Sequence, residues 1–174
     1  GNERVNLSIG KLIFRFHGKA SHASTAPELG RSAMDAAELM SVGIQYLREH
    51  IPMDARIHHK YLETMSAANV VPENAAVQYV VRAKDMNGVK DLIRRVVLVA
   101  QGAATMAETR MEYEICSVLP GTVILPRFTR FLYESARKIP PLTYTPQEEA
   151  FGLELYKNVF GTECPDSVLR KALV

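Results

Sequence analysis

Three polar residues occupy positions from which they could act on a ligand. His22 lies among small residues at 20–24, where an imidazole would be accessible rather than packed. Asn69 precedes a short apolar segment, and Arg82 follows thirteen positions later (82 − 69), near the end of a strand-like run. A loop histidine can donate to an oxyanion, and an arginine with an asparagine amide can hold a carboxylate. Each also has an ordinary interpretation: a solvated histidine, a turn-forming asparagine and a surface arginine.

Recognisable catalytic motifs are missing from the sequence. It contains no phosphate-binding glycine loop, no Gly-x-Ser-x-Gly elbow and no His-Glu-x-x-His motif. His58 and His59 are neighbours in a strand-like segment, so their side chains are expected to face opposite ways and cannot hold one ion together. No other set of potential ligands has the spacing of a metal site, and we expect this chain to bind no catalytic metal.

A regular order of strands and helices positions these residues. Segments rich in branched and aromatic residues predict strands, and segments with apolar residues every three or four positions predict amphipathic helices. The expected strands span 11–18, 56–65, 74–84 and 110–118, and the expected helices span 31–50 and 89–104. This β-α-β-β-α-β order predicts an α+β fold, the ferredoxin-like sandwich.

The remainder of the chain differs in character. Segments 123–138 and 146–160 predict further helices, and a short helix is expected at 167–173. These helices have apolar faces, yet no further strand offers a sheet for them to cover. We therefore divide the chain into a ferredoxin-like domain at 1–118 and a helical segment at 119–174 that belongs to something larger.

Composition is that of an ordinary globular protein. Apolar residues make up 47% and charged residues 23% of the chain, and 21 basic against 19 acidic residues give a net charge of +2. That charge is too small to attract nucleic acid, and no apolar run approaches the ~20 residues that span a bilayer. Cys116 and Cys164 lack motif spacing, so we expect reduced thiols in a cytoplasmic protein, with a single disulfide as the alternative.

Two blocks of the sequence carry a resemblance to a known family. Residues 16–37, FHGKASHASTAPELGRSAMDAA, resemble the start of the lid domain in the di-metal aminoacylase and carboxypeptidase family of metallopeptidases and amidohydrolases, whose pattern is Gly-Lys-x-x-His-Ala-x-x-x-Pro-x-x-Gly-x-x-Ala. Residues 68–82, ANVVPENAAVQYVVR, resemble its Asn-x-(Val/Ile)-Pro element and the strand ending in arginine. Segments 47–51 and 55–58 point more narrowly to the branch formed by the B-type subunit of aminobenzoyl-glutamate hydrolase. The resemblance covers 11–118 well and continues less sharply to 126.

The resemblance implies roles for individual residues. It implies that His22 reaches into the active site of a partner subunit, where it donates to the developing oxyanion, and that Asn69 and Arg82 hold the carboxylate of the substrate. Gly18 and Gly30 match the motif glycines and are expected to serve the backbone rather than a ligand. It further implies a homodimer formed through the lid sheet, with a second type of subunit possible.

The sequence also departs from the family. The metal-binding segments of the family, an early His-x-Asp or Cys-x-His element, a Glu-Glu pair and a late histidine, have no counterpart here. The resemblance thus implies a metal-dependent parent enzyme with two zinc or manganese ions, hydrolysing an N-acyl amino acid or an aminobenzoyl-glutamate-like amide. We expect this chain alone to be inactive.

Two other functions are compatible with the same element order. One is a free-standing regulatory or ligand-binding module, since one fold hosts many functions. The other is an RNA-binding domain, which needs exposed aromatic residues on its central strands and a basic surface. Phe14 and Phe16 would suit such a platform, but the third strand offers only Tyr79 and the net charge is +2.

Overall fold

A computed structural model describes residues 6–63, 67–140 and 143–165. It consists of two compact units that divide between Val123 and Ile124, and each is described by itself. The helix predicted at 167–173, and the last two residues of the strand predicted at 56–65, lie outside the described residues.

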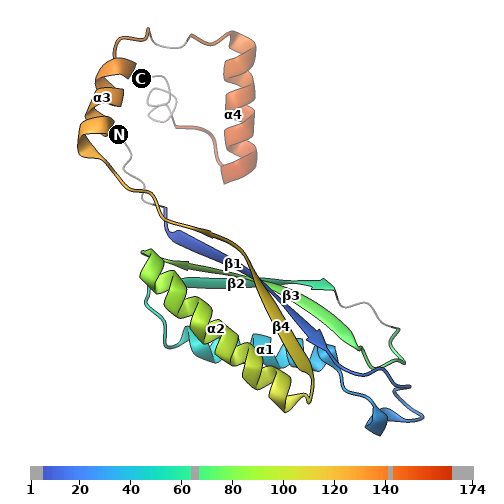
Figure 1. Ribbon diagram of the computed structural model, residues 1–174. Coiled ribbons are helices and arrows are strands. Elements are labelled where there is room, and N and C mark those ends of the chain that lie inside the picture. The colour runs from blue at the N-terminus through green and yellow to red at the C-terminus, as the bar shows by residue number, and fades with distance from the viewer. Residues whose placement is uncertain (1–5, 64–66, 141–142, 166–174) are drawn as a thin grey trace. The chain divides into compact units, whose positions relative to one another are not determined.

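The first unit has a four-stranded antiparallel sheet covered on one face by two helices (Figure 1). The strand order is β2-β3-β1-β4, and every neighbouring pair is antiparallel. This arrangement confirms the predicted ferredoxin-like α+β sandwich. The elements are β1 (Ser8–His17), a short 3₁₀ helix η1 (Pro27–Leu29), α1 (Ala33–Arg48), β2 (Arg56–Glu63), β3 (Asn74–Ala83), α2 (Met86–Met106) and β4 (Arg110–Leu119).

Alternation along the two central strands separates the core from the open face of the sheet. On β1, Leu12, Phe14 and Phe16 are fully buried under the helices. On β3, Val77 and Tyr79 lie opposite Phe14 and Leu12 and are fully buried on the same face. The buried faces of α1 and α2 coincide with their predicted apolar stripes. Since Phe14, Phe16 and Tyr79 are covered, the described sheet offers no aromatic platform of the kind that RNA-binding domains use.

Both helices begin at capping side chains. The Ser32 hydroxyl accepts a hydrogen bond from the backbone N–H of Asp35, and the Asp85 carboxylate accepts one from Gly88. Such caps satisfy backbone donors that the first helical turn leaves free. The helices are thereby fixed at their first residues, which holds the loops before them in place.

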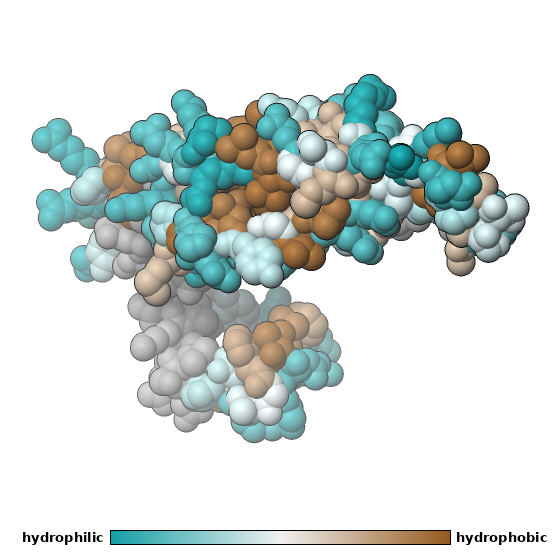
Figure 2. Space-filling view, turned by 90° about the horizontal axis from the view of Figure 1, so that it is seen from below, coloured by the Kyte–Doolittle hydropathy of each residue, from teal (hydrophilic) through white to brown (hydrophobic). Residues whose placement is uncertain are grey.

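The outer strands are less covered than the central ones. On β4, Tyr113 is 46% and Ile115 50% exposed, although both face the helical side. On β2, Tyr61 and Leu62 are also partly exposed. Figure 2 shows brown, apolar surface left between teal, hydrophilic side chains on the face it views.

The second unit contains helices α3 (Pro126–Ala136) and α4 (Pro146–Phe160), as predicted. Neither helix has a buried residue, and the large apolar side chains of both are exposed. A reciprocal capping box between Thr145 and Glu148 begins α4, and Gly161 ends it with a positive φ of 70°. Of the helices that the structure describes, none combines the length and apolar character that a bilayer-spanning segment needs.

Candidate functional site

The loop that contains His22 is fixed by backbone hydrogen bonds to the segment before β3. The Ala23 N–H donates to the Asn69 carbonyl at 2.9 Å, and the Val71 N–H donates to the Ser21 carbonyl at 2.9 Å. His22 itself forms an isolated antiparallel bridge with Val70. The structure therefore brings His22 and Asn69, which are 47 residues apart (69 − 22), to the same end of the sheet.

The two motif glycines permit close approaches of this loop. A Cβ atom on Gly18 would lie 1.9 Å from the backbone oxygen of Arg31, and one on Gly30 would lie 2.4 Å from the Ser21 hydroxyl. A side chain at position 18 would force the backbone apart, and one at position 30 would displace the side chains of Ser21 and Val71. The loop thus closes through Lys19 and Arg31, which exchange two backbone hydrogen bonds at 2.8 and 2.9 Å.

The His22 imidazole is exposed, and its Nδ1 atom is held by the loop. The backbone N–H groups of Ser24 and Thr25 both donate to His22 Nδ1 at 3.3 Å, and the Ser24 hydroxyl lies 3.2 Å from the same atom. Because Nδ1 accepts from two amides, the hydrogen-bond network assigns the proton of the neutral ring to Nε2. The free end of the ring is then an N–H donor, which is the group that an oxyanion requires.

Asn69 presents its amide to solvent beside this loop. Its backbone carbonyl is used by Ala23, and its side chain is exposed. A primary amide can donate to a carboxylate with two N–H groups. His22 and Asn69 therefore form one polar end of the sheet, on short segments held by backbone pairing.

Arg82 lies at the other end of the same sheet. It is exposed on the open face near the end of β3, directly opposite Ile9 on β1 and Arg56 on β2. Eight residue steps separate it from Asn74 at the start of β3, or roughly 26 Å along a strand. Within one chain, the structure does not bring Arg82 to His22 and Asn69. No carboxylate among the described residues forms an ion pair with it.

Two further polar contacts near His22 were not predicted from the sequence. His17, the last residue of β1, has Nδ1 at 2.8 Å from the Asn74 amide oxygen and Nε2 at 3.3 Å from a Glu112 carboxylate oxygen. Two residues earlier on the same strand, Arg15 forms an ion pair with Glu114 at 3.1 Å. His17 thus links β1 to both of its neighbours where the His22 loop begins. The only feature of the sequence that could have pointed to His17 is its position immediately before the Gly-Lys motif.

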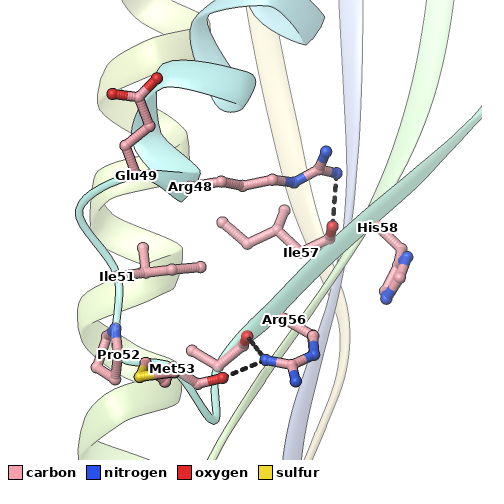
Figure 3. Close-up of a pocket in the computed structure, with 9 residues that line it drawn as sticks. Arg48, Glu49, Ile51, Pro52, Met53, Arg56, Ile57 and His58 are labelled. Atoms are coloured by element: carbon pink, nitrogen blue, oxygen red, sulfur yellow. Dashed lines mark hydrogen bonds between the residues drawn. The ribbon is translucent and has the colours of Figure 1, made fainter.

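A hollow of about 430 Å³ lies where α1 is followed by β2 (Figure 3). One guanidinium nitrogen of Arg48 donates to the Ile57 carbonyl at 2.6 Å, and Arg56 donates to the carbonyls of Met53 and Ala55. His58 lies on the far side of the Ile57 backbone in this view. The wall is thus cationic at one side and apolar at the other, where Ile51, Pro52 and Met53 lie.

His59 and its neighbours form a polar cluster between α1 and β2. Its ring stacks on Tyr79 with centroids 5.1 Å apart, and the Ser41 hydroxyl lies 3.0 Å from the Tyr61 hydroxyl and 3.3 Å from that of Tyr79. Burial lowers the pKa of His59, and the positive charges of Arg48 and His58 lower it further. Burial raises the pKa of Tyr79 to about 12. His58 is exposed on the opposite face, as the alternation of the strand predicts.

Metal ligands do not gather in the part of the chain that the structure describes. Residues 6–63, 67–140 and 143–165 contain no group of three or more His, Cys, Asp and Glu side chains that could hold an ion. Cys116 and Cys164 are both free thiols. His22 and Asn69 at one end of the sheet and Arg82 at the other are exposed hydrogen-bond donors, and donors alone cannot activate water.

Comparison with known proteins gives consistent results. A family described as a peptidase dimerisation domain matches residues 3–104. The B-type subunit of p-aminobenzoyl-glutamate hydrolase from Escherichia coli is 44% identical over 112 residues, 64% of this chain and 23% of that protein. A homolog of the A-type subunit of the same hydrolase, from Haemophilus influenzae, is 31% identical over 114 residues, 66% of this chain and 27% of that protein.

A solved structure resembles the fold over most of the chain. The aminobenzoyl-glutamate utilization protein from Klebsiella pneumoniae superposes with a TM-score of 0.64 at 26% identity, covering 77% of this chain and 34% of that one. The chain therefore spans about a quarter to a third of the length of the proteins that it matches.

Proposed function

The chain belongs to the peptidase dimerisation domain family, and on this premise we propose that it is the lid and dimerisation part of a metal-dependent amidohydrolase. Residues 1–118 are the lid domain in this proposal, and residues 119–174 are the return into the catalytic domain. The apolar side chains left exposed on α3 and α4 support the second assignment, because isolated helices rarely leave their apolar faces uncovered.

The observation that carries the proposed role of His22 is the state of its ring. Two backbone amides donate to Nδ1, so Nε2 carries the proton and faces solvent from a loop fixed at both ends. A neutral imidazole held in this way is a preorganised donor. Its Nε2–H stabilises the negative oxygen that develops when a nucleophile adds to the amide carbonyl of the substrate.

A two-fold dimer explains how Arg82 can share a site with Asn69. The outer edge of β2 is unpaired among the described residues, and a second copy can extend the sheet there by antiparallel pairing. Antiparallel pairing places the start of one β3 beside the end of the other, about three strand spacings or roughly 14 Å away. His22 and Asn69 of one chain then face the partner's Arg82 across a single substrate.

Arg48 limits where this pairing can begin. Its guanidinium occupies the outward-facing carbonyl of Ile57, so that carbonyl is not available to a second strand. Residues two and four positions further along, His59 and Tyr61, present their backbone groups on the same side. The proposed contact between copies is therefore centred on 59–61.

The proposed substrate is an amide of an amino acid with a free carboxylate. Arg82 and the Asn69 amide hold that carboxylate, and His22 acts at the scissile carbonyl. The relatives named above act, by their names, on p-aminobenzoyl-glutamate, which favours an aminobenzoyl-glutamate-like compound. Those names also distinguish two types of subunit, so the parent of this chain could work with a second type.

The described residues do not fit a di-metal site, since they contain no ligand group. In this proposal the parent holds its two divalent ions, zinc or manganese, through the family's metal-binding segments, which have no counterpart in this sequence. In this division of labour the lid residues bind, orient and polarise the amide, while the catalytic domain supplies the hydrolytic water.

The test is complementation between two inactive forms of the full-length protein. Protomers carrying His22→Ala are mixed with protomers whose metal ligands have been replaced. If His22 acts across the dimer, each heterodimer regains one complete site and activity returns to about half of the wild-type value per heterodimer. Heterodimers verified by mass spectrometry that remain inactive would exclude action in trans.

A further inference from the structure

Two arginines face each other across β2 and β3 on the open face of the sheet. Arg56 is the direct cross-strand partner of Arg82, and both side chains are exposed. Direct partners in an antiparallel pair have Cβ atoms about 5 Å apart and project to the same side. The proposed carboxylate-binding residue therefore has a second guanidinium beside it.

Like charges in this arrangement are unfavourable unless an anion lies between them. Lys11, on β1, is diagonal to Arg82 and adds a third positive charge to the same face. The acidic residues that β4 places on this face, Glu112 and Glu114, bind His17 and Arg15. The described residues thus form no ion pair with either member of the Arg56–Arg82 pair.

The Arg56 guanidinium is held with one edge unused. Its Nη1 atom donates to the Met53 carbonyl at 2.5 Å and to the Ala55 carbonyl at 2.6 Å (Figure 3). Those two bonds consume both Nη1 hydrogens, and no described residue accepts from Nε or Nη2. The free Nε–Nη2 edge is the fork that binds a carboxylate with two parallel hydrogen bonds.

We propose that Arg56 is a specificity-determining residue that binds a second carboxylate of the substrate, next to the one held by Arg82. The substrate class is then an N-acylated dicarboxylic amino acid, such as an N-acylglutamate, rather than an N-acylated amino acid with a neutral side chain. This inference rests on the proposed function, in which Arg82 holds the first carboxylate.

The inference is tested in the full-length protein with two substrates of nearly equal shape. N-(4-aminobenzoyl)glutamate carries the second carboxylate, and N-(4-aminobenzoyl)glutamine carries a neutral amide in its place. The wild type is expected to prefer the glutamate compound, and Arg56→Gln is expected to lower kcat/KM for that compound by roughly 10- to 100-fold, mainly through KM. Activity toward the glutamine compound changes little.

Lys90→Gln is the charge control, because Lys90 is exposed on α2, which covers the face of the sheet opposite to Arg56. It removes the same charge and leaves the preference unchanged. Arg56→Lys keeps the charge but loses the fork, and recovers only part of the preference. Equal effects of Arg56→Gln on both substrates, or equal effects of Arg56→Gln and Lys90→Gln, overturn the inference.

A second measurement separates this inference from the proposed enzyme activity. Both arginines belong to one chain, so the 174-residue chain can be titrated with N-acetylglutamate and N-acetylglutamine while the arginine Nε–H resonances are followed by NMR. Arg56 and Arg82 should both shift with the first compound, and only Arg82 with the second. No shift of Arg56 with the dicarboxylate contradicts the inference. If the isolated chain binds the two compounds selectively but the full-length protein hydrolyses neither amide, the role of Arg56 is supported and the proposed enzyme function is contradicted.

Discussion

At the scale of the residue, the orientation and tautomer of the His22 imidazole are fixed mainly by hydrogen bonds from backbone groups. Two amides of its own loop hold Nδ1, and the bridge to Val70 holds the chain on either side. An accessible histidine with a fixed tautomer can contribute to a transition state without contributing to ground-state binding.

His22→Ala in the full-length protein should therefore lower kcat roughly 10²- to 10³-fold, the usual effect of losing one oxyanion donor, with a smaller change in KM. Arg82→Ala should instead raise KM for carboxylate-bearing substrates, because its contact is made in the ground state as well as the transition state. Steady-state kinetics of both variants distinguish the two roles. A normal kcat for His22→Ala would show that this residue is an ordinary solvated histidine.

His59 makes the stability of the first unit sensitive to acid. Burial lowers the pKa of His59 in the folded state, so as the pH falls through the usual range of a histidine pKa the unfolded chain binds a proton more readily than the folded chain does. The contribution of His59 therefore lowers the free energy of unfolding as the pH falls through the unfolded pKa.

Replacing His59 with Gln should reduce this loss, measured as the difference between urea unfolding at pH 7.5 and at pH 5. His50→Gln is the control, since the side chain of His50 is exposed after the end of α1. Equal pH dependence in the wild type and His59→Gln would mean that the ring is solvated in the folded state.

The sequence could predict part of the site at this scale. The motif quoted for His22 and Asn69 places them in two segments, but only the backbone bonds from Ala23 and Val71 show that the segments are paired. The separation of Arg82 from Asn69 follows from strand geometry once β3 is known to run without interruption from Asn74 to Ala83. Arg56 gave no local signal, because cross-strand register depends on how two distant segments pair.

At the scale of the element, the periodicity of the sequence predicted all four strands and all four α-helices that the described residues form. Their ends are shifted by a few residues from the predicted ones. The start of β1 was missed by three residues (11 − 8), since Ser8, Ile9 and Gly10 have weak strand character as a group. They continue the strand because Ser8 pairs with Ala83 and its hydroxyl accepts from the Gly121 N–H. Tertiary pairing thus extended an element beyond its local propensity.

The two edges of the sheet should behave differently. On β2, Tyr61 lies at the proposed contact between copies and is 37% exposed, while Tyr113 on β4 faces the same side and is 46% exposed. A lysine on an edge strand discourages pairing with another strand, because the contact would bury its charge. Tyr61→Lys should therefore weaken self-association of the chain, and Tyr113→Lys should leave it unchanged.

Sedimentation equilibrium over a range of concentrations measures both variants against the wild type. Loss of association only in Tyr113→Lys would assign the contact to β4 instead. A wild-type chain that stays monomeric at high concentration would remove the proposed edge contact altogether. Urea unfolding of each variant checks that the monomers remain folded.

At the scale of the whole molecule, the chain matches only part of its relatives, and in the proposed function its chemistry is completed by the rest of the parent protein. It spans 23% of the E. coli relative, and its described residues lack a metal-ligand group. The alternative function, a free-standing regulatory or ligand-binding module, can be distinguished from the proposed lid by the length of the gene. A reading frame that continues on both sides with metal-binding motifs supports the lid, and a short frame supports the module.

The isolated chain should therefore neither hold metal nor hydrolyse an amide. After dialysis, elemental analysis is expected to find less than one zinc or manganese ion per chain, because tight binding needs several His, Cys or carboxylate ligands around one ion. Incubation of the chain with N-(4-aminobenzoyl)glutamate and added zinc or manganese should release no 4-aminobenzoate, detected by its absorbance.

The full-length protein is the positive control in the same assay, and it should lose activity to a chelator and regain it with metal. His22→Ala serves as the control for the lid, since it should lower activity without changing the metal content of the full-length protein. One or more tightly held ions per isolated chain, or hydrolysis by that chain, would place part of the metal site within these 174 residues. If the full-length protein stays active after complete removal of metal, the metal-dependent mechanism itself is contradicted. In the proposed mechanism Nε2 of His22 polarises the amide and the guanidinium of Arg82 holds the substrate, but neither group can generate the nucleophile.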